Sequence, residues 1–184
     1  MRFVSRRTVL AVGGTLAAGL MPRKPHAETL GDPAAKLVRT NPPVEPPDTV
    51  FLDAEGGEHR ISGFRGRGMV INFWATWCAP CVAEMPALAA LSKSLAPHDI
   101  AVLPLSSDRG GAPVVRPWLA EKGLTGLPVL LDPKGAMARA WQVRGLPTTV
   151  IIDRQGRDRG RLEGTADWST PSAVALIRKL VEEG

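Results

Sequence analysis

The chain contains little histidine and cysteine, which limits the metal and haem sites that it could form. It has three histidines and two cysteines in 184 residues. A structural zinc site needs about four ligands of these kinds, and His26, His59 and His98 lie far from the cysteines in sequence. A covalent haem site would need a histidine directly after Cys81, where the chain has Val82. We therefore expect neither a zinc site nor covalently bound haem.

The chain also lacks an excess of charge outside its amino terminus. The formal net charge is +5, but residues 1–27 hold five of the 23 basic residues and no acidic residue. The remaining 18 basic and 18 acidic side chains cancel. Because a neutral body has no broad field that attracts phosphates, we expect no nucleic-acid partner.

A hydrophobic run long enough to cross a membrane comfortably is missing near the amino terminus. The 14 apolar or small residues 8–21 would rise about 21 Å as a helix, less than the roughly 30 Å of a bilayer core. A basic stretch precedes them and a polar one follows, as in a secretory signal peptide, and residues 5–10 resemble a twin-arginine export signal. We predict that residues 1–27 are a signal peptide or an uncleaved membrane anchor, and that the domain works in the periplasm, either free or tethered to the inner membrane.

Residues 28–47 are predicted to be a linker, because they end in the proline-rich run 41–47. Such a run favours extended polyproline geometry and acts as a semi-rigid spacer. The folded domain is then expected to cover residues 48–184, beginning with a β-hairpin made of residues 50–53 and 58–61.

After the hairpin, apolar strands alternate with amphipathic helices. Strands are predicted at 69–75, 100–105, 129–132, 148–153 and 157–163, and helices at 81–95, 114–122, 136–141 and from 170 to 183. Thr170 suits the cap of the last helix, and Pro171 suits its first position. This order indicates an α/β fold with a mixed sheet flanked by helices.

The two cysteines lie three residues apart, directly after a predicted buried strand and at the start of a predicted helix. The first turn of a helix has unpaired N–H groups and a partial positive charge, which favour a thiolate at Cys78. The pKa of a free thiol, near 8.5, can fall to roughly 3.5–7.5 in such a motif. Pro80 fits the first helical turn. We predict that Cys78 is the nucleophile of thiol–disulfide exchange and that Cys81 is the resolving thiol.

Other interpretations of the pair are weaker. A structural disulfide that closes so small a loop would add little stability, and a peroxidatic cysteine would need no partner three residues away. A copper-binding chaperone that uses both thiolates and a redox-inert binding domain stay open as alternatives.

Residues 70–81, which include Trp77-Cys78-Ala79-Pro80-Cys81, resemble the thioredoxin superfamily, and residues 145–153 are similar to its exported TlpA/ResA branch. The closing stretch 164–168 resembles TlpA most. The resemblance implies a thioredoxin fold with an amino-terminal hairpin and an inserted strand and helix. It also implies a monomeric reductase with no cofactor besides its cysteine pair, serving cytochrome c maturation or copper-centre assembly of respiratory oxidases. Its partners would be cysteine-containing exported client proteins and a membrane thiol electron donor. An oxidant that forms disulfides stays open as an alternative.

The resemblance also implies a buried group that takes up the proton of the resolving thiol. Thioredoxins have a buried aspartate where this chain has Asn72, which cannot take up a proton. Glu84, three residues beyond Cys81, is the candidate substitute, since a partly buried carboxylate there would have a raised pKa and could pass protons. The alternative is a solvated helix charge without a role.

Four residues are expected to meet the substrate. In this fold a cis-proline faces the first cysteine, and Pro147, preceded by Leu146, comes before the strong strand 148–153, as the resemblance requires. Pro128 also follows a Gly-Leu pair, and we predict a trans bond there. Trp77 and Pro80 would offer apolar surface to partners.

Overall fold

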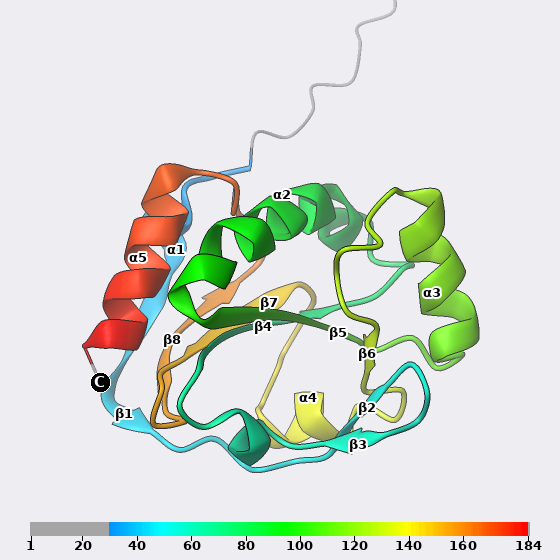
Figure 1. Cartoon of the computed structure of the whole chain (residues 1–184), viewed down its shortest axis with the longest axis horizontal. Helices are drawn as coiled ribbons and strands as arrows, with labels where there is room; N and C mark the ends of the chain where they lie inside the picture. The colour runs from blue at the N-terminus through cyan, green and yellow to red at the C-terminus, as the bar shows by residue number, and fades with distance from the viewer. Residues whose placement is uncertain (1–29, 184) are drawn as a thin grey trace, which may run out of the picture.

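A mixed β-sheet forms the centre of the domain (Figure 1). The computed structural model describes residues 30–183, so the predicted signal peptide or anchor, residues 1–27, lies outside the described residues. Within this part of the chain the sheet has eight strands in the order β1-β8-β7-β4-β5-β6-β2-β3. They are β1 (Val38–Val44), β2 (Phe51–Asp53), β3 (Glu58–His59), β4 (Gly68–Trp74), β5 (Ile100–Ser106), β6 (Leu130–Leu131), β7 (Thr148–Ile152) and β8 (Asp158–Glu163).

Strand β4 is the central strand, and all seven of its residues are buried. It runs parallel to β5 and antiparallel to β7. Alternate residues face opposite cores, as the period of a strand dictates: Val70 and Trp74 belong to one, and Met69, Ile71 and Phe73 to the other. A strand covered on both faces is mostly apolar, and Asn72 is the one polar side chain of β4, which is why its sequence was recognisable.

Helices cover both faces of the sheet (Figure 1). Side chains of α2 (Ala79–Leu95), α3 (Ala112–Glu121) and α5 (Pro171–Glu182) pack into the core that contains Trp74. Residues of α4 (Ala136–Ala140) and of the 3₁₀ turn η1 (Ile61–Phe64) pack into the other core. A second 3₁₀ turn, η2 (Ala96–His98), follows α2. The layered arrangement predicted from the sequence is confirmed.

The last helix begins as its sequence predicted. Thr170 is the cap of α5, and its hydroxyl oxygen accepts a hydrogen bond from the Ala173 N–H at 3.2 Å. Pro171 occupies the first helical position, where its missing N–H is not needed. Among residues 30–183, no helix has both the length and the apolar character needed to cross a membrane.

The predicted linker is the main correction. Within residues 28–47 the structure has a short helix α1 (Pro33–Lys36) and the strand β1, which pairs antiparallel with β8 and closes one edge of the sheet. Pro42 and Pro43 lie where the register of the two strands shifts, between Arg39 and Val44. An edge strand can hold prolines at such an irregularity because the missing N–H leaves no partner unsatisfied. The folded part therefore includes residues that composition alone assigned to a spacer.

Candidate active site

The cysteine pair lies where β4 ends and α2 begins. Cys78 and Cys81 are joined by a disulfide, with 5.3 Å between their Cα atoms. Cys78 is the N-cap of α2, and its Sγ accepts a hydrogen bond from the Cys81 N–H at 3.3 Å. After reduction this N–H and the positive end of the helix would favour an ionised sulfur at Cys78. Cys81 is fully buried, whereas Cys78 retains 7% of its surface, so partners reach the pair through Cys78.

A buried carboxylate that the sequence analysis missed holds the turn before Cys78. Asp108 Oδ2 accepts from the Thr76 N–H at 2.9 Å, and Oδ1 accepts from the Thr76 hydroxyl at 2.7 Å. The Ser106 hydroxyl also donates to Asp108 at 2.7 Å. A signal for this contact was available: polar residues follow β5, and the carboxyl ends of neighbouring parallel strands meet at one edge of a sheet. Asp108, in the loop that follows β5, therefore holds Thr76 and with it the turn before Cys78.

Glu84 is completely buried on the inner side of α2. Its Oε1 accepts from Asn72 Nδ2 at 2.9 Å, and its Oε2 accepts from the Ala166 N–H at 3.2 Å and from Trp168 Nε1 at 3.1 Å. Burial raises the pKa of the Glu84 carboxyl to about 7, although these three donors and the charge of Lys36 oppose the rise. The interpretation of Glu84 as a solvated helix charge is therefore wrong, because the side chain is buried.

Asn72 connects Glu84 to the neighbouring strand. Its amide nitrogen donates to Glu84 and also to the Thr149 hydroxyl at 2.9 Å. Its Oδ1 atom is buried and has no hydrogen-bond partner among the described residues. Since neither Asn72 nor Thr149 carries a charge, Glu84 is the member of this buried cluster that can change its protonation near neutral pH.

The proline loop lies at the same end of the sheet as the cysteines. Strand β7 pairs with β4 so that Phe73 lies opposite Thr148, which puts Pro147 next to the end of β4. The Leu146–Pro147 bond is cis, as predicted, and Pro128 does not share this geometry, also as predicted. Leu146 is half-buried and Pro147 is buried.

Two side chains next to the cysteines in sequence are exposed. The Trp77 side chain is 69% exposed directly beside Cys78, and Pro80 is exposed in the first turn of α2. Exposed tryptophan next to a buried disulfide offers contact area to an incoming polypeptide. Of the seven residues singled out in the sequence, five lie between Trp77 and Glu84 around the start of α2, and Leu146 and Pro147 precede β7 beside the end of β4. Their catalytic and binding roles stay predictions.

The model of the AhpC/TSA family matches residues 42–158, which is more than half of the chain. The chain belongs to the AhpC/TSA family. It is 37% identical over 120 residues to "Thiol-disulfide oxidoreductase ResA" of Geobacillus kaustophilus (strain HTA426), a match that covers 65% of this chain and 67% of the relative. The expected relation to the TlpA/ResA branch is confirmed at this level.

Two solved structures share the fold of this chain. A thiol:disulfide interchange protein from Chlorobium tepidum TLS matches with a TM-score of 0.63 and 21% identity, over 77% of this chain and 99% of that one. The exposed lipoprotein thioredoxin Etrx1 of Streptococcus pneumoniae matches with a TM-score of 0.57 and 26% identity, over 72% and 98%. This member of the AhpC/TSA family therefore has a thioredoxin-like fold and is a thiol:disulfide oxidoreductase.

Proposed function

We propose that this oxidoreductase works in the periplasm as a reductant of disulfides in a few exported proteins. The observation that carries the proposal is the position of Cys78, which caps α2 with its sulfur and is the accessible member of a pair whose other member is sealed. Exposed Trp77 beside it provides a surface on which a client polypeptide can lie. No cofactor besides the cysteine pair is needed for this chemistry.

The exchange proceeds in two steps. The Cys78 thiolate attacks one sulfur of a client disulfide, forming a mixed disulfide, while the client's other sulfur leaves as a thiolate and is protonated. Cys81 then loses its proton to the Glu84 carboxylate and attacks Cys78 Sγ, which releases the client's remaining sulfur. Two electrons have passed to the client, and the protein is left with the Cys78–Cys81 disulfide. A membrane thiol electron donor must reduce this disulfide before the next cycle.

The resemblance to the TlpA/ResA branch suggests which clients are served. We place them among apocytochromes c awaiting haem attachment or respiratory oxidase components awaiting copper. Both kinds of client must present free cysteines outside the cytoplasm, where thiols are readily oxidised to disulfides.

Trapping tests the proposed function. In Cys81→Ser the second step is blocked, so clients should stay covalently attached to Cys78 and should be released by dithiothreitol. Cys78→Ser is the matched control and should trap no client, because it retains one cysteine but loses the accessible one. Equal trapping by both variants, or by neither, would contradict the assigned roles.

The direction of electron flow needs a separate measurement. For a two-electron couple, about 30 mV shifts the equilibrium by about 1.4 kcal/mol. A reduction potential well below those of strong oxidants supports a reductant, whereas a value near about −120 mV would make the protein an oxidant that forms disulfides.

A further inference from the structure

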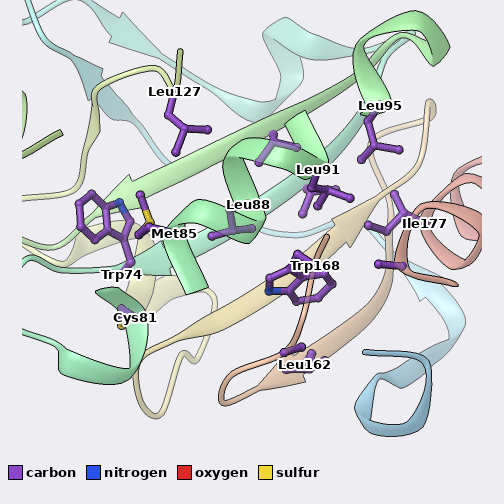
Figure 2. Packing of buried hydrophobic residues seen from close by; sticks show 14 of the residues in the cluster. Trp74, Cys81, Met85, Leu88, Leu91, Leu95, Leu127, Leu162, Trp168 and Ile177 are labelled. Atoms are coloured by element: carbon purple, nitrogen blue, oxygen red, sulfur yellow. The ribbon is translucent and has the colours of Figure 1, made fainter. Parts of the chain in front are cut away.

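The loop 165–168, between β8 and α5, supplies two of the three hydrogen bonds that Glu84 accepts. The Ala166 N–H and the Trp168 indole N–H both donate to Oε2 of Glu84. Trp168 is completely buried and packs in the same core as Leu88 and Leu91 of α2 (Figure 2). The indole is therefore held firmly by packing while its nitrogen faces the buried carboxyl.

The amino-terminal segment 31–36 holds this loop in place. Gly31 O accepts a hydrogen bond from the Asp167 N–H at 2.9 Å, and Lys36 Nζ donates to Thr165 O at 2.9 Å. At the start of α5, the Ser172 hydroxyl donates to Asp32 at 3.2 Å. The loop that contacts Glu84 is thus fixed from outside by a part of the chain that precedes the hairpin.

We propose that Trp168 is a positioning residue that acts through Glu84, and that segment 31–36 keeps its loop aligned. The indole N–H and the Ala166 N–H stabilise the ionised carboxylate, whereas burial opposes it. The balance between these two hydrogen bonds and burial determines at which pH Glu84 can accept the proton of Cys81. The inference rests on the proposed function insofar as it assigns Glu84 this proton.

The effects of other titratable and charged groups on the pKa of Glu84 must be distinguished from the effect of the indole. On α2 these are the two cysteines, which do not titrate while they form a disulfide. From the amino-terminal segment, the charge of Lys36 favours the ionised carboxyl. In the loop itself, the Asp167 carboxylate accepts from the N–H and hydroxyl of Ser169. A substitution at Trp168 leaves all of these charges in the sequence, so a change in Glu84 titration can be assigned to the indole.

The test compares Trp168→Phe with Trp141→Phe in the full oxidised chain. Trp141 is also buried, and its indole N–H donates to Pro47 O at 2.9 Å, but it lies in the core on the opposite face of the sheet. Glutamate labelled with ¹³C at the side-chain carboxyl is titrated by NMR, and Glu84→Gln identifies the Glu84 signal. Because a hydrogen bond to a charged group is lost, Trp168→Phe should raise the pKa of Glu84 by about one unit. Trp141→Phe should leave it unchanged.

A second variant leaves the core intact. Lys36→Met removes the donor to Thr165 and the positive charge, and should raise the pKa of Glu84 less than Trp168→Phe does; Lys36→Arg should restore it. An unshifted Glu84 signal in Trp168→Phe would overturn the role of Trp168, and an unshifted signal in Lys36→Met would overturn that of segment 31–36.

The same variants are then tested for exchange. The pH midpoint of client release from the mixed disulfide should move with the pKa of Glu84 in Trp168→Phe, and Trp168→Phe should cause no further movement in a Glu84→Gln background. If the NMR signal shifts while the unmodified protein catalyses no exchange, the proposed function fails and the positioning of Glu84 by Trp168 stands. If exchange occurs but the pH midpoint of client release does not move when the pKa of Glu84 shifts, Trp168 has no part in the reaction.

Discussion

Replacing Glu84 with glutamine should make the stability of the oxidised protein less dependent on pH. Burial raises the pKa of Glu84 from its ordinary value of 4.5 to about 7. The folded state therefore binds this proton more tightly than the unfolded state does. Its contribution to stability is complete below pH 4.5 and is lost progressively as the pH rises to about 7.

The magnitude follows from the size of the shift. Each pKa unit corresponds to about 1.4 kcal/mol, so a rise from 4.5 to about 7 corresponds to about 3 kcal/mol. The free energy of unfolding of Glu84→Gln, relative to the unmodified protein, should thus increase by about 3 kcal/mol between pH 4 and pH 8. Any cost of placing an amide opposite the donors of Asn72 and Trp168 is common to all pH values and cancels in this comparison.

Urea unfolding of the oxidised protein, followed by tryptophan fluorescence at several pH values, measures this difference. Glu121→Gln, on the exposed surface of α3, is the matched control and should follow the unmodified protein. A difference between Glu84→Gln and the unmodified protein that stays constant from pH 4 to pH 8 would refute the assignment of a buried, readily protonated carboxyl.

Two further predictions concern the amino-terminal strand and the last helix. A Cβ atom at Gly160 would lie 2.6 Å from Leu37 Cδ2 and 3.1 Å from Val38 O, so Gly160→Ala should lower the free energy of unfolding by about 1–3 kcal/mol. Gly126→Ala, where a Cβ meets nothing within 4 Å, should be almost neutral in the same urea titration; equal effects would contradict the docking of β1. Thr170→Ala should lower the free energy of unfolding by about 1 kcal/mol, because the α5 cap is lost. Thr170→Ser keeps the hydroxyl and should retain most of that stability. Equal melting temperatures for the Ser and Ala variants would speak against the cap.

Local sequence patterns predicted most of the fold because burial of a strand and the start of a helix each require particular residues at neighbouring positions. The apolar run of β4 reflects a strand covered on both faces, and Thr170-Pro171 reflects the chemistry of a helix start. The residues around the cysteine motif likewise predict its surroundings, a strand followed by the amino terminus of a helix. These features needed no knowledge of distant residues.

The features of the fold and the site that the sequence did not predict depend on contacts between distant parts of the chain. Whether Glu84 is solvated or buried is decided by Ala166 and Trp168, more than 80 residues away in sequence. Strand β1 was missed because residues 28–47 contain five prolines. Two of them lie in the strand itself, and only its position at the edge of the sheet makes them acceptable. Asp108 was missed although its place after β5 was a signal, because its partner, Thr76, is 32 residues away in sequence.

The unequal exposure of the two sulfurs has a consequence for how the protein meets its partners. With Cys81 buried in the core, the client and the electron donor of the proposed reductant cycle must both react at Cys78. Because Cys78 can form only one mixed disulfide at a time, the two partners compete for it. In that cycle the protein has to react with client and donor in turn, and an abundance of oxidised clients would slow the reduction of its own disulfide.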